Sequence, residues 1–204
     1  HGRRSCGLST IGTTSFFPSK PFGGYGDGGA CFTSDPELAD RMRRVSRHGQ
    51  AKRYFHTDIG VNGRIDTLQA AIVLAKFQLF EGEVKARQNV AERYNQEFAR
   101  VGITTTPKLA SANTSVYAQY TIQVEDRLAV QDRLKQHGVP TAVHYPTLLS
   151  QQPVFAGSGT THVDQCTSPN ALHASERVLS LPMHPYLTKE EQHTVVTALT
   201  ASLG

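Results

Sequence analysis

The sequence predicts an α/β protein built in two parts. Short runs of β-branched and aromatic residues, which favour strands, alternate with stretches of helical periodicity along the chain. Near Gly82 a long helical pattern gives way to strands with one apolar face, so we expect a first domain at residues 1–82 and a second at residues 83–204. The 204 residues are 38% hydrophobic and 19% charged with a net charge of +4, which is typical of a globular chain.

Strand and turn signals dominate the beginning of the first part. The run at 8–17 (LSTIGTTSFF) is rich in β-branched and aromatic residues and predicts a buried strand. A dense turn region follows at 18–29, and a short strand is expected at 30–33. Segment 34–37 (SDPE) combines a capping side chain with a proline in the first turn, which predicts a helix that continues to about Arg47.

The strongest helical pattern runs from Asp66 to about Phe98, where apolar residues keep to helical spacing. Gly82 lies inside this helix. A glycine in a helix interior costs about 1 kcal/mol relative to alanine. We therefore expect a bend or break at Gly82 and place the domain boundary there.

The second part returns to strands and shorter helices. Alternating apolar residues at 116–124 predict a strand with one apolar face. Asp126 is placed to cap a helix that ends before Gly138, and residues 139–143 predict a further strand. The predicted order is therefore strand, helix, strand.

Three elements are expected in the last third of the chain. Residues 154–167 are rich in Gly, Ser and Thr and predict a loop, and residues 169–178 predict a short helix. Thr188 and Glu191 have the spacing of a capping box, which predicts a final helix through Leu203.

Composition excludes several kinds of protein. The most apolar stretch, 70–80, is interrupted by Lys76 and Gln78, so nothing approaches the roughly 20 apolar residues of a membrane span. Three cysteines without CxxC spacing indicate neither a disulfide framework nor a zinc site, and a reducing cytoplasm and no metal are expected.

The basic stretch at 41–53 lacks the aromatics and motifs of nucleic-acid binding, which favours a solvated helix face.

The most informative segment is the glycine-rich turn around Lys20. Five glycines fall within residues 23–29 and allow the backbone to approach a ligand closely. Aromatic neighbours are expected to limit the hydration of Lys20, and a neutral amine attacks a carbonyl to form a Schiff base. Ser15 and Ser19 supply hydroxyls for a phosphate. The alternative is a flexible surface loop with a solvated lysine, whereas a P-loop is excluded because its lysine follows its glycines.

These residues resemble a known family. The run at 15–30 (SFFPSKPFGGYGDGGA) is similar to the Schiff-base lysine segment of the DegT-type sugar aminotransferases, pyridoxal-phosphate enzymes of fold type I. Further motifs follow in the family's order: 48–50 (HGQ), 60–71 (GVNGRIDTLQAA), 143–146 (VHYP) and 181–185 (LPMHP). The resemblance runs from Arg3 to the C-terminus.

The resemblance implies the C-terminal portion of the family's fold: the end of the pyridoxal-phosphate-binding large domain at residues 1–82 plus the small α/β C-terminal domain at 83–204. The family's preceding half holds the acidic partner of the pyridine nitrogen, the residue that stacks on the ring and a phosphate-binding helix start. None of these is matched here. We therefore expect an incomplete fragment, with catalysis by a full-length chain.

Roles for the cofactor-binding residues also follow from the resemblance. Lys20 is implied to hold pyridoxal phosphate covalently and to move the proton during transamination. A lysine there, rather than the histidine of dehydrating relatives, favours amino transfer. Ser15 is implied to bind the cofactor phosphate, and Asn62 to reach the phosphate in the partner subunit of a homodimer. Without the resemblance, Asn62 is most simply a turn residue before a helix.

Substrate contacts are implied at three further positions. Arg64 stands at the opening of the long helix, where a cation is unfavourable for the helix dipole, and its guanidinium can bind a carboxylate through two parallel hydrogen bonds. His144 and Tyr145 precede Pro146, at the expected end of the strand at 139–143, where sugar contacts are implied. The alternatives are an ordinary surface arginine and a His-Tyr pair used in packing or a turn.

Within the family, the resemblance is strongest to enzymes that aminate a 3-keto UDP-N-acetyl-hexuronate. The implied function is transfer of an amino group, with L-glutamate as the expected donor, to such a keto nucleotide sugar for bacterial surface polysaccharide or lipopolysaccharide biosynthesis. The alternatives are a non-catalytic regulatory or partner protein with the same fold, and an aminotransferase for a different keto sugar.

Overall fold

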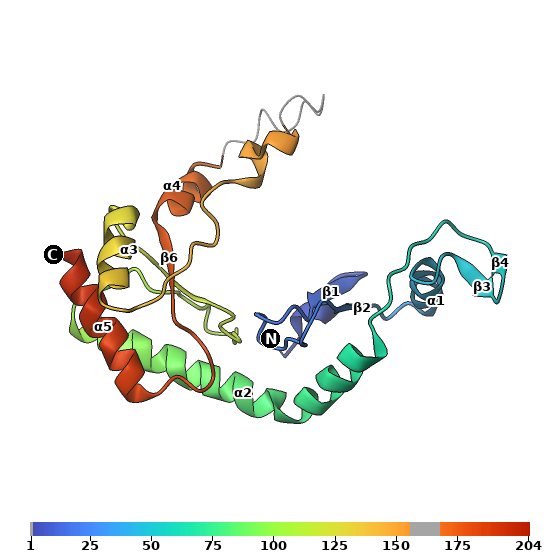
Figure 1. The fold of residues 1–204 in the computed structure, drawn as a ribbon, viewed down its shortest axis with the longest axis horizontal. Coiled ribbons are helices and arrows are strands. Elements are labelled where there is room, and N and C mark those ends of the chain that lie inside the picture. The colour runs from blue at the N-terminus through green and yellow to red at the C-terminus, as the bar shows by residue number, and fades with distance from the viewer. Residues whose placement is uncertain (1, 156–167) are drawn as a thin grey trace. The chain divides into compact units, whose positions relative to one another are not determined.

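The computed structural model of the protein describes residues 2–155 and 168–204. The chain divides into two compact units, His1–Glu83 and Val84–Gly204, each described by itself below (Figure 1). No helix among the described residues has the length and apolar character needed to cross a bilayer.

The first unit holds two small hairpins, a short helix and the first half of a long helix. Its elements are the 3₁₀ turn η1 (Ser5–Gly7), β1 (Gly12–Ser15), β2 (Gly29–Phe32), α1 (Pro36–Val45), β3 (Gln50–Lys52), β4 (Phe55–His56) and the beginning of α2 (Thr67–Arg100).

β1 and β2 form an antiparallel hairpin in which Gly12 pairs with Phe32 and Ser15 with Gly29. The strand expected at 8–17 is therefore shorter than predicted, and the prediction of burial is wrong, because only Gly12 within β1 is buried. The reason is that β1 pairs with β2 and with no other described strand, so it lies at the edge of a two-stranded sheet.

α1 begins as its sequence predicts. The Asp35 carboxylate accepts hydrogen bonds from the backbone N–H groups of Glu37 and Leu38, at 2.8 and 3.1 Å, which satisfies two donors of the first turn. The helix ends at Val45, two residues earlier than expected, and His48 takes a left-handed backbone with φ 61°. The β3–β4 hairpin that follows was not predicted, because its strands are only two and three residues long.

α2 confirms the long predicted helix and extends it to Arg100. The expected break at Gly82 is wrong, because the helix continues through it without interruption. A cost of about 1 kcal/mol is small against the cooperative hydrogen bonding of the turns on both sides.

The second unit packs helices around an antiparallel pair of strands. Its elements are the second half of α2, β5 (Tyr120–Gln123), α3 (Arg127–Gln136), the 3₁₀ turns η2 (Leu149–Gln151) and η3 (Pro153–Phe155), α4 (Pro169–Arg177), β6 (Val178–Leu181) and α5 (Lys189–Leu203). β5 pairs with β6 so that Tyr120 faces Leu181 and Gln123 faces Val178.

The hydrophobic core of the second unit joins α2, β5, α3, β6 and α5. Tyr94 lies at its centre, with its ring 4.7 Å from that of Tyr120 and 5.4 Å from that of Phe98. Burial raises the pKa of both tyrosines. Their hydroxyls remain satisfied, since Tyr94 donates to the Pro182 carbonyl at 2.9 Å and Tyr120 donates to Asn95 Oδ1 at 2.6 Å.

Two strand predictions in this unit need correction. The strand expected at 116–124 is reduced to β5, although Tyr120, Ile122 and Val124 are buried in the alternation that was predicted. The strand expected at 139–143 is wrong: Ala142 alone makes an isolated bridge, to Ser180. Pro140 lies within that segment and has no N–H to donate to a ladder.

The helix predictions in this unit are confirmed. Asp126 caps α3 through its carboxylate, α4 covers the expected helix, and Thr188 and Glu191 form the capping box of α5. β6 was not predicted, because a strand of four residues carries too short a pattern. Most of the loop expected at 154–167 lies outside the described residues.

Candidate cofactor and substrate site

Lys20 lies in a tight turn that begins directly after β1. Its backbone N–H donates to the Phe17 carbonyl at 2.9 Å, and the Phe17 N–H donates to Ser15 Oγ at 3.1 Å. Both ends of the turn are thus fixed through the peptide groups of one residue. The Ser15 hydroxyl keeps its own proton for donation outward, because it acts here as an acceptor.

The glycines of the turn allow it to pack against itself and against α2. A Cβ on Gly23 would lie 2.6 Å from the Phe17 carbonyl oxygen, and one on Gly26 would lie 3.0 Å from Gln69 Nε2. Gln69 Oε1 also accepts from the Tyr25 N–H at 2.8 Å. At these two positions the close neighbour is the chain itself, and the close approach of the turn to a ligand stays a prediction.

The aromatic residues of the turn also pack onto α2. The Phe22 ring lies 5.5 Å from that of Phe16, 5.7 Å from that of Phe77 and 4.7 Å from that of Phe80. Lys20 itself is exposed. The expectation that aromatic neighbours limit its hydration is not met by the described residues, since these rings contact one another and the helix.

Asn62 and Arg64 form a second pair of predicted site residues. Arg64 Nε donates to Asn62 Oδ1 at 2.9 Å, and both residues are exposed. This hydrogen bond uses the amide oxygen of Asn62 and the Nε of Arg64. It leaves the Asn62 amide N–H groups and the terminal guanidinium nitrogens available for anionic ligand groups.

The segment that carries this pair is held against the end of α1. His48 N–H donates to the Val61 carbonyl at 3.0 Å, and Val61 N–H donates to the Val45 carbonyl at 2.8 Å. Gly49 has φ 74°, and a Cβ there would lie 1.6 Å from the Asp58 carbonyl oxygen. Only glycine fits this close crossing of the two backbone segments.

A salt bridge reinforces the same crossing. Arg44 Nε lies 2.9 Å from Asp58 Oδ2, and Arg44 also pairs with Asp40 on its own helix. The hydrogen bond from Arg44 lowers the pKa of the Asp58 carboxyl below its ordinary value of 3.8, with a further contribution from Thr57. The Asp58 side chain is therefore ionised at neutral pH and links α1 to the loop before Asn62.

His144 and Tyr145 lie in the second unit. Their rings are 5.5 Å apart in an edge-to-face arrangement, and Tyr145 is 69% exposed. The expectation that they end a strand is wrong, as the segment forms only the bridge at Ala142. His144 is held instead by its ring, whose Nδ1 lies 3.0 Å from Ser180 Oγ in β6.

The structure thus brings the predicted residues together in three pairs. Ser15 and Lys20 share a turn and Asn62 and Arg64 a hydrogen bond, both within the first unit. His144 and Tyr145 stand side by side in the second. The contributions of Phe17, Gln69 and Ser180 were missed. They act through backbone groups or across long sequence separations, for which one sequence carries no signal.

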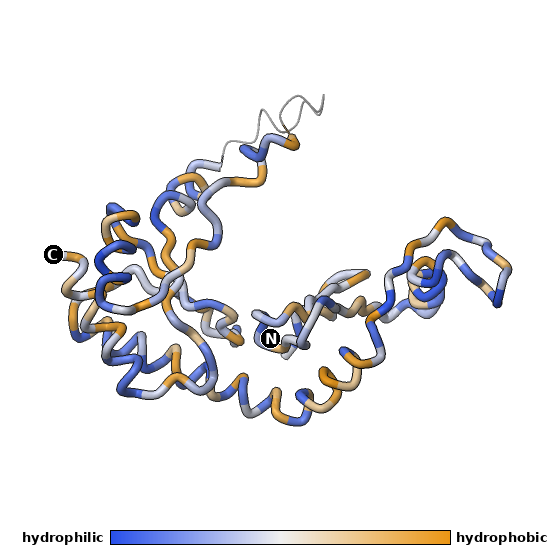
Figure 2. Tube along the Cα trace, in the orientation of Figure 1, coloured by the Kyte–Doolittle hydropathy of each residue, from blue (hydrophilic) through white to orange (hydrophobic). Residues whose placement is uncertain are grey.

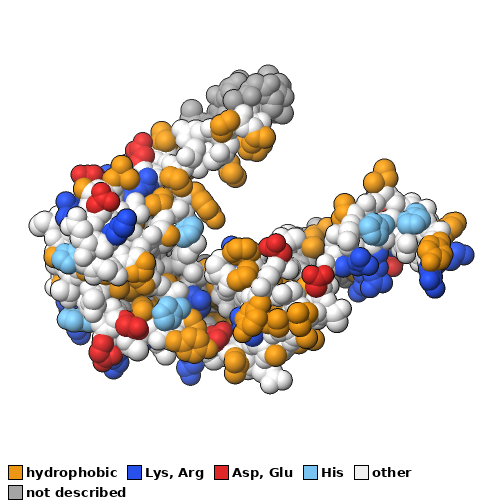
Figure 3. Space-filling model, in the orientation of Figure 1, with side chains coloured by type: hydrophobic (Ala, Val, Ile, Leu, Met, Phe, Trp, Pro, Cys, Tyr) orange, Lys and Arg blue, Asp and Glu red, His pale blue; other side chains and the backbone are white. Residues whose placement is uncertain are grey.

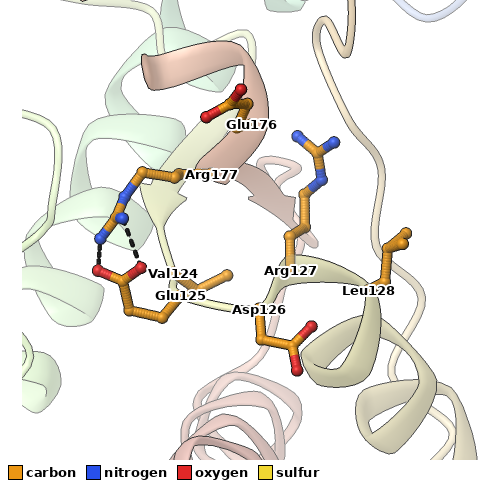
Figure 4. Close-up of a pocket in the computed structure, with 7 residues that line it drawn as sticks. All are labelled: Val124, Glu125, Asp126, Arg127, Leu128, Glu176 and Arg177. Carbon is orange, nitrogen blue, oxygen red and sulfur yellow. Dashed lines mark hydrogen bonds and ion pairs between the residues drawn. The ribbon is translucent and has the colours of Figure 1, made fainter.

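A shallow surface pocket in the second unit involves none of these residues. It lies between the start of α3 and the end of α4, lined by Val124, Glu125, Asp126, Arg127, Leu128, Glu176 and Arg177. Figure 4 shows Arg177 paired with Glu125 on one side and Arg127 on the other. Within the described ranges, no group of three or more His, Cys, Asp or Glu side chains could hold a metal ion.

Comparison with known proteins defines the class. The sequence profile of the DegT/DnrJ/EryC1/StrS aminotransferase family matches residues 1–200, and the chain belongs to this family. It spans about half the length of the curated relatives that it matches.

Two relatives illustrate the range of that family. The chain is 51% identical over 199 residues to the UDP-2-acetamido-2-deoxy-3-oxo-D-glucuronate aminotransferase of Pseudomonas aeruginosa, with 98% of this chain and 54% of the relative covered. It is 40% identical over 191 residues to the pleiotropic regulatory protein of Geobacillus stearothermophilus, with 93% of this chain and 50% of the relative covered.

Solved structures show that the α/β fold of this chain matches about half of the chain of larger aminotransferases. A DegT/DnrJ/EryC1/StrS aminotransferase from Brucella abortus superposes with a TM-score of 0.86 at 37% identity, covering 98% of this chain and 52% of that one. NtdA from Bacillus subtilis, solved with bound cofactor PMP, gives a TM-score of 0.84 at 30% identity, covering 96% and 46%.

The chemistry of the described donor groups fits the family's cofactor in part. Lys20 offers an exposed primary amine for an aldehyde, and Ser15, five residues before it, offers a hydroxyl for a phosphate. The Asn62 amide N–H groups can also donate to a phosphate. These residues fit the aldehyde and phosphate groups of pyridoxal phosphate.

Proposed function

We propose that the protein to which this chain belongs is a pyridoxal-phosphate-dependent aminotransferase that acts on a keto nucleotide sugar. The substrate is a 3-keto UDP-N-acetyl-hexuronate, the amino donor is glutamate, and the product enters bacterial surface polysaccharide. One observation carries the proposal: an exposed lysine amine stands in a turn that also fixes a serine hydroxyl, in a chain that belongs to the DegT/DnrJ/EryC1/StrS aminotransferase family.

The proposal assigns each unit to a part of the family's fold. The first unit is the end of the large, cofactor-binding domain, and the second is the small C-terminal domain, in line with the split at Glu83. Asn62 serves the cofactor phosphate of a partner subunit, so the active enzyme is a homodimer. The rest of the large domain supplies the partner of the pyridine nitrogen.

Pyridoxal phosphate, when bound, supplies an electron sink for the carbon that exchanges its amino group. Lys20 Nζ would hold the cofactor at its aldehyde group, and once the amino donor has displaced it, the freed amine would take up and return a proton as general base and acid. The Ser15 hydroxyl donates a hydrogen bond to the phosphate. Because Phe17 holds the backbone of Lys20 and the hydroxyl of Ser15, the turn would present an amine and a phosphate donor from one segment.

Arg64 recognises the carboxylate of the sugar. Asn62 Oδ1 binds its Nε, which orients the guanidinium and leaves its two terminal nitrogens for a bidentate contact. His144 and Tyr145 contact the sugar from the second unit, where the exposed Tyr145 ring offers an apolar face and a hydroxyl. The identity to the Pseudomonas aeruginosa enzyme, whose name specifies a 3-oxo-glucuronate, supports this substrate class.

A second candidate is a regulatory protein that keeps the fold and the lysine without turnover. The observation in its favour is the 40% identity to a relative named as a regulatory protein. The two candidates differ in what glutamate does to the bound cofactor, since only an aminotransferase passes its amino group on.

The test uses the full-length protein incubated with pyridoxal phosphate. We expect visible absorption of the bound cofactor that glutamate removes and the keto-uronate restores, with the amino sugar detected by mass spectrometry. Lys20→Ala is the control and gives neither change. Absorption that persists in the presence of glutamate and of other amino acids contradicts the enzyme and favours the regulator.

A further inference from the structure

The hydroxyl groups of Ser180 and Thr121 follow the His144 ring in a chain of hydrogen bonds within the second unit. His144 Nδ1 lies 3.0 Å from Ser180 Oγ, and Ser180 Oγ lies 2.9 Å from Thr121 Oγ1. The three side chains form a continuous hydrogen-bonded row in which Ser180, only 5% exposed, lies between Thr121 and His144, which are both half-buried.

The strand register fixes this row. Thr121 and Ser180 face each other across β5 and β6. The backbone of Ser180 is used on its other side, where its N–H donates to the Ala142 carbonyl at 2.8 Å and its carbonyl accepts from the Ala142 N–H at 3.1 Å. In the antiparallel ladder, Thr121 and Ser180 are therefore a pair that exchanges no backbone bonds. Side chains of such pairs lie closest together.

Three separate segments thus meet at one serine. β5 supplies the Thr121 hydroxyl, β6 supplies Ser180, and the segment at Ala142 brings His144 to it two residues later. The Ser180 hydroxyl can donate to Nδ1 or accept from it, and in both cases the contact holds the plane of the ring. Nε2, on the far side of the imidazole, is then the nitrogen presented to a ligand.

We propose that Ser180 is a positioning residue for the keto-sugar substrate: together with Thr121 it occupies Nδ1 of His144 and directs Nε2 to an uncharged oxygen of the sugar. This inference rests on the proposed function, because it takes His144 as a substrate contact. Ser180 and Thr121 do not touch the substrate themselves. Their contribution is to restrict the imidazole before the sugar binds.

The test compares hydroxyl deletions in the full-length enzyme. Ser180→Ala removes the contact to Nδ1, Thr121→Val removes only the hydroxyl that contacts Ser180, and Ser180→Thr keeps a hydroxyl at position 180. Ser175→Ala is the matched control: Ser175 is a buried serine of the same unit, 6% exposed, whose hydroxyl donates to the Leu172 carbonyl at 2.7 Å.

We expect Ser180→Ala to raise KM for the keto sugar roughly tenfold, which is the scale of one lost positioning hydrogen bond. Thr121→Val should raise it by a smaller factor, and Ser180→Thr should recover most of the loss. The rate of the glutamate half-reaction, measured alone, should stay at the wild-type value in all variants. An equal loss in both half-reactions, or the same rise in KM for Ser175→Ala, overturns the proposal.

A second readout does not depend on turnover. In protein labelled with ¹⁵N-histidine, the His144 ring signals are identified by their loss in His144→Gln. We expect Ser180→Ala to shift the Nδ1 resonance, whereas Ser175→Ala leaves it in place. An unchanged Nδ1 resonance in Ser180→Ala overturns the proposal. If that resonance shifts but the wild-type protein aminates no keto sugar, the positioning of His144 stands and the proposed function fails.

Discussion

Phe17 is the residue through which the two ends of the lysine turn are coupled. Its carbonyl accepts from the Lys20 N–H and its own N–H donates to Ser15 Oγ. The residue types at 15 and 20 indicate a phosphate contact and a Schiff base, and the sequence suffices for that hypothesis. It does not predict that a backbone group between them sets their spacing, because such bonds depend on the folded turn.

Arg64 provides the sharpest test of substrate class. Arg64→Ala should lower kcat/KM for a keto-uronate about tenfold to a hundredfold, the loss expected when a charge-assisted hydrogen bond is removed. The value of kcat/KM for a neutral keto sugar should fall much less. Arg64→Lys is the control that keeps the charge but not the planar pair of donors. Equal losses of kcat/KM for the two sugars would contradict recognition of the carboxylate by Arg64.

The ionisation of Asp58 should make the free energy of unfolding of the first unit depend on pH. Its folded pKa is lowered by Arg44, so its ionised form is favoured in the folded state. This stability is present above the ordinary pKa of 3.8 and is lost as pH falls through the lower, folded value. We expect Asp58→Asn to be less stable than wild type at pH 7, with a difference that narrows below pH 3.8.

Urea denaturation of both proteins at a series of pH values measures this difference. Arg44→Met should give the same narrowing, because it removes the other partner of the pair. The ordinary carboxyl pKa values lie at about 4, so about pH 2 is well below them. A stability difference between variant and wild type that stays constant down to that pH would show that the salt bridge contributes nothing.

At the level of elements, helices were predicted better than strands. α1, α3 and α5 begin at capping side chains that are visible in the sequence: Asp35, Asp126 and Thr188. β6 and the β3–β4 hairpin were missed because a strand of two to four residues carries too short a pattern. The segment at 139–143 failed because its apolar residues suggested a strand that Pro140 cannot complete.

Two glycines make a matched pair of predictions for α2 and the turn beside it. Gly82→Ala should stabilise the protein by about 1 kcal/mol, because a Cβ there meets nothing within 4 Å and alanine is the better helix former. Gly23→Ala should destabilise it by about 1–3 kcal/mol, because its Cβ would press on the backbone of the lysine turn. Denaturation midpoints of the two variants, compared with wild type, check both signs. A stabilising Gly23→Ala would contradict the packing of the turn.

For the molecule as a whole, the two units differ in how they bury apolar residues. The second unit holds a continuous core. In the first unit, Val73 is the only large apolar side chain of the described residues that is buried. Leu68, Leu74, Phe77 and Leu79 on α2 are each at least 60% exposed. Figure 2 shows hydrophobic positions recurring along the first half of α2, and Figure 3 shows apolar side chains gathered on the surface there. Helical spacing predicted which apolar residues lie on one face of the helix. It did not predict whether another layer covers that face.

This exposure predicts how the 204-residue chain behaves when it is produced by itself. Exposed apolar surface of this kind promotes association, so we expect concentration-dependent self-association in sedimentation velocity. Replacing Leu74 and Phe77 together by glutamine should reduce it, whereas the same change at the exposed Leu128 and Tyr186 of the second unit should not. A chain that stays monomeric at all concentrations would contradict this account of α2.

The most direct measurement is covalent trapping at Lys20. The full-length protein is incubated with pyridoxal phosphate, reduced with borohydride and digested, and its peptides are mapped by mass spectrometry. The account predicts a pyridoxyl group on Lys20, in the peptide that contains the run SFFPSKPFGG. Labelling only at other lysines, or no label at all, would contradict it.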